Sequence, residues 1–251
     1  MVDLKITVIT AVYNRADTVT EAIRSVHKQT YPDVEHVVID GASSDGTLAI
    51  MQNLAHDLTD FILVSEPDKG IYDALNKGMN RSTGDIIGLM HSDDFFADER
   101  VLESVAKAFA DDEVDAVYGD LMYVSKDNPS RVIRHWRAGE FCPSSLKRGW
   151  MPPHPTLFVR RRVIEKWGGY DTRYRIAADY DCILRYFVQR RFRAVYIPRV
   201  LVKMRMGGES NRSLSRIWLK TTEDYKALRS NSVGGFSALL LKNLGKVSQF
   251  F

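Results

Sequence analysis

Polar and acidic residues follow four predicted strands of this 251-residue chain, each at the point where a strand ends. They are Tyr13-Asn14 after the first strand, Asp40 at the end of the second, Asp68-Lys69-Gly70 after the third and His91-Ser92-Asp93-Asp94 after the fourth. Because ligands of open parallel sheets bind beyond the carboxyl ends of the strands, we expect these side chains to meet at one edge. The turn preferences of Asp, Asn and Gly would explain one such loop, but they explain all four poorly.

Asp93 and Asp94 give the sharpest chemical signal, because two neighbouring carboxylates after a buried strand repel each other unless they share a cation. Hard oxygen ligands of this kind suit Mg²⁺ or Mn²⁺, which typically combine one or two carboxylates with substrate phosphates. The chain has neither a GxxxxGKS/T loop nor a GxGxxG fingerprint. Their absence argues against a P-loop phosphotransferase and a Rossmann dehydrogenase.

The elements that must position these residues alternate along the first 120 residues. Strands are predicted over residues 5–12, 35–40, 61–65, 85–90 and 115–118, and helices over 46–56, 71–81 and 98–110. A further helix starts at a capping box of Thr18 and Glu21 and ends before Pro32. This alternation predicts βαβ units, and therefore an α/β fold with a mostly parallel sheet.

The pattern changes after Gly119, where strand-like pieces are predicted over 121–124, 132–136 and 194–203 and a helix over 179–189. No composition break marks a linker, so we expect one domain over residues 1–212. Its front (1–120) would bind the nucleotide, its back (121–212) would face the acceptor, and residues 213–251 would form a C-terminal helical segment.

Charge divides the chain into an acidic and a basic half. Residues 1–125 hold 9 Lys and Arg against 23 Asp and Glu, whereas residues 126–251 hold 26 against 9. The basic half predicts an anionic partner, namely nucleic acid, a phosphorylated substrate or a membrane surface, and mutual attraction of the two halves is the alternative. Two cysteines, Cys142 and Cys182, cannot form a disulfide framework or a zinc site, which favours a reducing compartment. No apolar run approaches the length of about 18 residues that a membrane-spanning helix needs.

Several motifs, taken together, resemble glycosyltransferase family 2. In chain order they are TAVYNR, VIDGASSDGT, EPDKGIYDALNKG, HSDD, HPTLFVRR, GGYDTRYRIAADYDCILR and the Gly-Gly-x-Ser element at residues 207–210. Each is weak alone, but the combination is specific and covers about residues 4–212. The resemblance implies the GT-A fold, with a Rossmann-like, mostly parallel sheet flanked by helices and followed by C-terminal helices, and a reaction that inverts configuration at the sugar.

The resemblance also implies roles for residues at the predicted edge. The segments that hold the base and ribose correspond to Thr10, Val12, Tyr13, Asn14 and Asp40, and the donor-sugar and diphosphate segment corresponds to Lys69, Asp73 and Asn76. The family's common Asp-Asp-Gly-Ser pattern is Asp40-Gly41-Ala42-Ser43 here, so the second acid is missing. Asp94 matches the ligand of a divalent metal, Mn²⁺ or Mg²⁺, which bridges the donor diphosphate, and Asp93 matches a residue near the ribose or sugar. His154, between prolines, would contact the acceptor or donor sugar, with a turn histidine as the alternative.

Asp179, in Ala178-Asp179-Tyr180-Asp181, resembles the catalytic base of the family, where Glu-Asp is frequent and this chain has Ala-Asp. An inverting transfer needs one base that takes the proton of the acceptor hydroxyl as its oxygen attacks the anomeric carbon. Asp181 lies two positions further on, so the two side chains point to different faces of a helix. An acid in the first turn is also explained by the helix dipole. We therefore predict Asp179 rather than Asp181 as the base.

The sequence thus predicts an inverting, metal-dependent glycosyltransferase that moves a sugar from a UDP-sugar to a saccharide hydroxyl. The resemblance implies a lipid-diphosphate-linked acceptor in surface polysaccharide synthesis, and a cytoplasmic enzyme at the inner face of the cell membrane. A basic amphipathic helix from residue 236 onward suits such a membrane interface, and docking on the protein's own core is the alternative. Its predicted apolar stripe is Phe236, Leu239, Leu240, Leu244, Val247 and Phe251, with Lys242 on the polar face.

Three other functions fit the sequence less well. A sugar nucleotidyltransferase usually needs a Gly-rich, basic loop after the first strand, which TAVYNRADT lacks. A catalytically weak sugar-nucleotide-binding subunit would be expected to lack Asp94 or Asp179, and both are present. A nucleic-acid binder is disfavoured because the basic half contains no recognisable binding motif.

Overall fold

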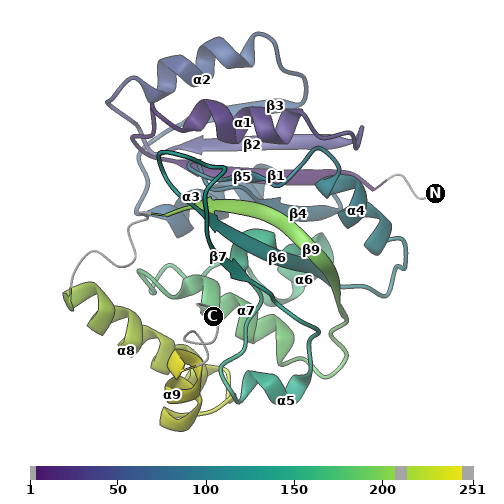
Figure 1. Cartoon of the computed structure of the whole chain (residues 1–251), viewed down its shortest axis with the longest axis vertical. Coiled ribbons are helices and arrows are strands. Elements are labelled where there is room, and N and C mark those ends of the chain that lie inside the picture. Colours follow the sequence, from purple (N-terminus) through teal and green to yellow (C-terminus); the bar gives the residue numbers. More distant parts are fainter. Residues whose placement is uncertain (1–3, 207–213, 245–251) are drawn as a thin grey trace.

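The computed structural model describes residues 4–206 and 214–244, and its centre is one mixed sheet (Figure 1). The strands of this described part follow the order β3-β2-β1-β4-β8-β6-β9-β5, and β7 pairs with β6 beside this path. Their bounds are β1 Ile6–Val12, β2 Val34–Asp40, β3 Phe61–Ser65, β4 Ile86–Leu89, β5 Phe95–Phe96, β6 Ala116–Val124, β7 Val132–Trp136, β8 Phe158–Arg160 and β9 Ala194–Arg205.

The first four strands, β3-β2-β1-β4, are all parallel, as their alternation with helices predicts. The β-branched run of β1 is buried along its whole length, because helices cover both faces of the sheet there. Beyond β4 the sheet is mixed: β8 is antiparallel to both β4 and β6, whereas β6 and β9 are parallel. The predicted strands 115–118 and 121–124 are one continuous strand, β6.

Helices flank the sheet, and several more lie below it in the view of Figure 1. They are α1 Val19–His27, α2 Thr47–Ala55, α3 Ile71–Arg81, α4 Val101–Ala108, α5 Pro143–Leu146, the 3₁₀ helix η1 His154–Thr156, α6 Arg161–Trp167, α7 Ala178–Phe187, α8 Leu214–Ser230 and α9 Phe236–Leu244. The C-terminal helices α8 and α9 lie beside α7, away from the parallel strands. Tyr180 of α7, Leu228 of α8 and Leu239 of α9 belong to one buried apolar cluster, so these helices share a core with the sheet.

The predicted capping box of α1 does not form. The Thr18 hydroxyl donates instead to the carbonyl of Ser92 over 2.9 Å, and Glu21 forms an ion pair with Arg205 at the end of β9. Both side chains therefore bind partners outside α1 rather than the amides of their own helix. The start of α1 is tied to the Asp93-Asp94 loop in this way.

Helix α9 docks on the protein rather than presenting one continuous apolar stripe. Leu239 is buried, whereas Phe236 and Leu240 are exposed, and Lys242, predicted on the polar face, is buried. The Lys242 ammonium pairs with Asp224 over 2.8 Å and lies 3.1 Å from the centroid of the Tyr180 ring, which explains how the charge is tolerated. The Leu244 side chain, Val247, Phe251 and the Gly-Gly-x-Ser element lie outside the described residues. Within the described ranges, no helix is long and apolar enough to cross a membrane.

Candidate active site

The loop after β1 presents one exposed side chain from its predicted base-binding stretch, that of Tyr13, which is 59% exposed. Thr10 and Val12 are buried within the sheet, and the Thr10 hydroxyl bonds to His36 over 2.9 Å. Asn14 adopts a left-handed conformation with φ of +50°. Its amide oxygen accepts the Ser44 N–H over 2.9 Å, so Asn14 joins the loops that follow β1 and β2.

Asp40 ends β2 with its carboxylate fully enclosed. The hydroxyls of Ser43 and Ser65 both donate to it, the second over 2.6 Å, and the Ser43 N–H adds a third bond of 3.1 Å. The side chain is 0% exposed. The carboxylate is thus held by the protein's own donors, and its contact with the base stays a prediction.

The loop before α3 and the helix itself carry the predicted donor-sugar segment. Lys69 is exposed, and its N–H donates to Asp73 over 3.0 Å. Asn76 is committed elsewhere: its amide donates to the Tyr170 carbonyl over 2.8 Å and accepts the Tyr170 N–H over 2.9 Å. Asn76 thus clamps two distant segments together, which leaves Lys69 and Asp73 as the more accessible members of the predicted set.

The two carboxylates after β4 point into different surroundings. Asp94 is 1% exposed, and one of its oxygens accepts the Arg205 N–H over 3.0 Å. Burial, reinforced by the neighbouring Asp93, raises the pKa of the Asp94 carboxyl well above its usual value. Its other oxygen is buried without a hydrogen-bond partner in the described part of the chain. Asp93 is only half-buried, and its negative charge raises the pKa of the neighbouring His91 against the effect of burial.

Asp179 lies in the first turn of α7, where its carboxylate is held by two donors. The Tyr180 N–H donates to it over 2.8 Å, and the Tyr72 hydroxyl lies 3.3 Å away while donating to the Ile176 carbonyl over 2.6 Å. Burial, together with Asp179, raises the pKa of Tyr72 well above its usual value, so the phenol stays protonated. Asp181, by contrast, is buried and bound to Arg185 and Asn231.

Two imidazoles, those of His91 and His154, lie within reach of the charge of Asp179. Burial lowers the pKa of His91, against the opposing charges of Asp93 and Asp179. Burial likewise lowers the pKa of His154 to about 4, opposed by Asp179 and reinforced by His91. The two rings have centroids 6.2 Å apart. Asp93, Asp179 and His154, which the sequence singles out, are therefore brought together around His91, and both imidazoles are neutral at pH 7.

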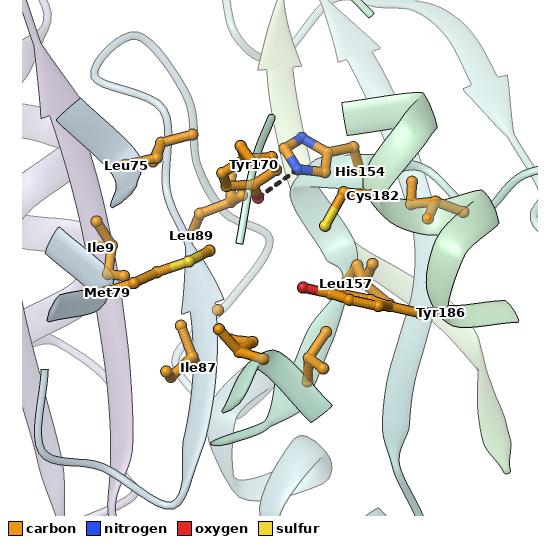
Figure 2. A pocket seen from close by; sticks show the side chains of 14 residues that line it. Ile9, Leu75, Met79, Ile87, Leu89, His154, Leu157, Tyr170, Cys182 and Tyr186 are labelled. Carbon is orange, nitrogen blue, oxygen red and sulfur yellow. Dashed lines mark hydrogen bonds between the residues drawn. The ribbon is translucent and has the colours of Figure 1, made fainter. Parts of the chain in front are cut away.

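A small cavity lies beneath His154, whose ring nitrogen bonds to the Tyr170 hydroxyl over 2.7 Å (Figure 2). Its volume is about 30 Å³, and its lining is mostly apolar, with Leu75, Met79, Leu89 and Cys182 among the labelled side chains. That volume corresponds to about one water molecule. A sugar or nucleotide does not fit in this cavity.

Sequence reasoning assigned no role to His91, Tyr72 or Glu223, although all three shape the site. His91 and Tyr72 stand within the quoted HSDD and EPDKGIYDALNKG motifs, so their position was visible. Glu223 of α8 carries no local signal. Its carboxylate accepts the N–H groups of Arg175, Ile176 and Ala177 over 2.8 to 3.0 Å, immediately before α7.

Solved structures of similar shape define the class of the fold. S. aureus TarS in complex with UDP-GlcNAc matches with a TM-score of 0.70 at 18% identity, over 92% of this chain and 66% of that one. The mannosyltransferase PcManGT from Pyrobaculum calidifontis, in complex with GDP-Man and Mn²⁺, matches with a TM-score of 0.63 at 21% identity, over 99% of this chain and 81% of that one. The chain has the GT-A fold that these glycosyltransferases share, and it spans slightly less than two thirds of that TarS chain.

Sequence comparison gives the family. A family model described as Glycosyl transferase family 2 matches residues 7–168. A PGL/p-HBAD biosynthesis glycosyltransferase of Mycobacterium bovis is 30% identical over 210 residues, which cover 82% of this chain and 79% of that protein. The putative glycosyltransferase EpsE of Bacillus subtilis is 29% identical over 205 residues, which cover 80% of this chain and 73% of that protein. The chain belongs to glycosyltransferase family 2, and its activity is sugar transfer.

Proposed function

We propose that this glycosyltransferase moves a sugar from a UDP-sugar to a saccharide hydroxyl with inversion of configuration. One observation carries the proposal: the charges of Asp93 after β4 and Asp179 of α7 both raise the pKa of His91, although the two residues are far apart in the sequence. A carboxylate for the donor side and a carboxylate for the acceptor side are thus both close enough to His91 for their charges to shift its pKa. The family relationship and the exposed Tyr13 ring support a nucleotide-sugar donor at the same edge.

Asp179 acts as the general base in this proposal. It takes the proton of the acceptor hydroxyl while that oxygen bonds to the anomeric carbon and the bond to the UDP oxygen breaks. Attack opposite the leaving group inverts the configuration. The Tyr72 hydroxyl and the Tyr180 N–H fix the carboxylate, and neutral His91 and His154 add no cation that would compete for its charge.

A divalent cation, Mn²⁺ or Mg²⁺, would neutralise the charge that develops on the leaving diphosphate. Within the described ranges, no three His, Cys, Asp or Glu side chains form a cage of their own, which suits a cation held by one or two carboxylates and the diphosphate. We place this role on Asp93 rather than on the predicted Asp94. Asp94 is enclosed beside Arg205, whereas a hydrated cation needs open space. The unpartnered oxygen of Asp94 keeps it the second candidate.

The acceptor proposed is a lipid-diphosphate-linked saccharide at the inner membrane face. The 26 Lys and Arg of residues 126–251 and the exposed Trp218 and Phe236 support this, and a relative named for PGL/p-HBAD biosynthesis is compatible with it. The docking of α9 through Leu239 and Lys242 limits the surface available for a membrane to the outer faces of α8 and α9. Nucleic acid is not among the proposed partners.

The experiment that tests this function measures UDP release from a panel of UDP-sugars, with Mn²⁺ and with EDTA. We expect release from at least one donor, and its loss in EDTA. Asp93→Asn should abolish release, whereas Asp94→Asn should keep metal-dependent release, because its enclosed side chain does not bind the cation. Release from no UDP-sugar would contradict the proposal. Full activity in EDTA would show that the reaction needs no divalent cation. If Asp94→Asn abolished UDP release and Asp93→Asn did not, Asp94 would be the metal ligand.

A further inference from the structure

We infer that Lys242 of the C-terminal helix α9 is a positioning residue for the base Asp179. Through the ring of Tyr180 and through its own charge, Lys242 holds the Asp179 carboxylate in place and favours its ionised form. The inference rests on the proposed role of Asp179, and it extends the site to a helix beyond residues 7–168, which the family model matches. Within the described ranges no ion pair joins Lys242 to Asp179, because the ammonium pairs with Asp224 of α8.

Lys242 carries a buried charge. Its side chain is 4% exposed, and so is that of Asp224, its partner at 2.8 Å. Taking both charges out of water is costly, and two well-packed apolar side chains are often at least as stable in such a place. Stability alone therefore does not account for this pair, which points to a role for it at the site beside it.

Tyr180 of α7 connects this cation with the base. The Lys242 ammonium lies 3.1 Å from the centroid of the Tyr180 ring, close enough for attraction between the cation and the ring face. The backbone N–H of Tyr180 donates to Asp179 over 2.8 Å. The Tyr180 hydroxyl is buried without a hydrogen-bond partner among residues 4–206 and 214–244, so the contact with Lys242 is made by the ring face. A cation that holds the ring thereby also restrains the N–H that binds the base.

A close backbone contact fixes the place of Lys242. Gly149 has φ of +78°, and a Cβ atom built on it would lie 2.3 Å from the Cβ atom of Lys242 and 2.5 Å from its Cα atom. Only a glycine permits this approach of the two segments. Lys242 is thus held by the Gly149 turn, by Asp224 of α8 and by the Tyr180 ring of α7. Its ammonium therefore has one defined position beside the turn that carries the base.

Lys242 is the one positive charge among the described side chains whose shifted pKa values respond to Asp179. These side chains are Tyr72 of α3, His91 after β4, His154 of η1, Tyr170 before α7, Cys182 of α7 and Lys242 of α9. Burial lowers the pKa of both histidines and raises the pKa of both phenols and of the thiol, so these five groups are neutral at pH 7. The carboxylate of Asp93, which raises the pKa of His91, adds a negative charge to the same surroundings.

The charge of Lys242 is coupled to that of the base. Burial lowers the pKa of the Lys242 ammonium and Lys220 of α8 adds to this effect, whereas Asp224 and Asp179 raise the pKa. The attraction between a cation and a carboxylate is mutual, so the Lys242 ammonium favours the ionised form of Asp179. The ionised carboxylate is the form that accepts the proton of the acceptor hydroxyl.

The test measures kcat for UDP release as a function of pH in the wild-type protein, in Lys242→Met/Asp224→Asn and in the control Lys226→Met. The double variant removes the ammonium without leaving a buried carboxylate unpaired, and Lys226 is an exposed lysine of α8. In the double variant we expect the acid limb of the profile to move to higher pH by about one unit, the lower end of the effect of a neighbouring charge. The limb should stay in place in Lys226→Met, and the KM for the donor should stay unchanged in both variants.

Two further variants separate charge from packing, with circular dichroism as the check on folding. Lys242→Arg keeps the charge and should keep the acid limb of the wild-type protein. Gly149→Ala keeps the ion pair but displaces the backbone of Lys242, so it should move the limb in the same direction as the double variant.

The possible outcomes distinguish this inference from the proposed function. An acid limb that stays in place in the folded double variant, or in Gly149→Ala if the double variant does not fold, would overturn the inference alone. A shift in Lys242→Arg as large as that in the double variant would also overturn it, because the effect would then be steric. Wild-type turnover in Asp179→Asn would instead overturn the proposed base first.

Discussion

At the scale of single residues, the site separates carboxylates that are free to react from carboxylates that hold the fold. Asp179 is half-buried and faces the neutral imidazoles of His91 and His154. Asp181, two positions along α7, is bound to Arg185 and Asn231. The same α7 turn thus supplies one reactive group and one structural group.

Asp179→Asn should lower turnover by about 10²-fold or more, the usual loss when a general base is removed. Binding of UDP should remain, because the donor does not need the proton acceptor. Steady-state UDP release and calorimetry measure the two quantities. Asp181→Asn serves as the control, and we expect it to lower the melting temperature more than the turnover. An inactive Asp181→Asn beside an active Asp179→Asn would reverse the assignment.

The buried His154 makes stability depend on pH. Its pKa is about 4 in the folded protein and near the ordinary 6.5 when unfolded, so between these values the unfolded state binds more protons. The stability it contributes is present above pH 6.5 and is lost as the pH falls toward 4. His154→Gln should flatten this dependence by up to about 1.4 kcal/mol per pH unit. Urea unfolding at several pH values between 4 and 7 measures it, and an equal slope in both proteins would contradict the shift.

The sequence predicts which residues gather at this site better than it predicts the role of each one. Asp93, Asp179 and His154 lie together, because strand ends and helix starts can be predicted from local patterns. The hydrogen bonds that Ser43 and Ser65 donate to Asp40 depend on how the loops fold over it. No spacing in the sequence reports that kind of tertiary hydrogen bonding.

At the scale of elements, α8 supports the turn that carries the base. Glu223 is 5% exposed and collects three backbone N–H groups from residues 175–177, whose amides would otherwise lack partners at the start of α7. Tyr72 of α3 holds the same turn from the other side through the Ile176 carbonyl. The turn is therefore fixed between the donor-side helix and the C-terminal helix.

Glu223→Gln should lower kcat about tenfold or more while the KM for the donor stays unchanged, because the loss of hydrogen bonds to a charged group loosens the turn before Asp179. The exposed Glu165→Gln is the matched control and should leave both constants unchanged. Steady-state kinetics with circular dichroism separate this effect from unfolding. Equal kcat values in the two variants would show that α8 does not position the base.

Elements that the sequence could not predict are those with weak local patterns. β5 has two residues and β8 has three, too few for a period to show, and each pairs with a longer strand, β5 with β9 and β8 with β6. The long β-branched runs of β1 and β2 are predicted, because burial of both faces needs continuous apolar sequence. The local pattern predicts Lys242 on the surface. Its burial depends on the ion pair with Asp224 and the contact with the Tyr180 ring, which no local pattern reports.

At the scale of the whole molecule, the exposed apolar side chains of the C-terminal helices lie outside the shared core. Trp218 of α8 is 70% exposed and Phe236 of α9 is 73% exposed, while Leu239 of α9 packs inward. In a chain whose second half is strongly basic, such residues suit an anionic lipid surface. Docking and membrane binding are thus compatible on opposite faces of the same helices.

Trp218→Ser combined with Phe236→Ser should abolish sedimentation with anionic liposomes and leave the melting temperature unchanged, because neither side chain is buried. Val132→Ser, at an exposed apolar position of β7, is the control and should still sediment. Neutral liposomes should retain less of the wild-type protein at every salt concentration, and high salt should weaken the anionic case. Wild-type protein that ignores anionic liposomes would remove the membrane from this account.

The central claim is that one base, Asp179, drives a direct displacement at the anomeric carbon. The most direct measurement is the anomeric configuration of the product formed first, followed by proton NMR during turnover of an α-linked UDP-sugar. The account predicts a β-linked product, because a single displacement inverts the carbon it attacks. An α-linked product would contradict it, since retention requires either two displacements or a nucleophile that enters on the side that UDP leaves.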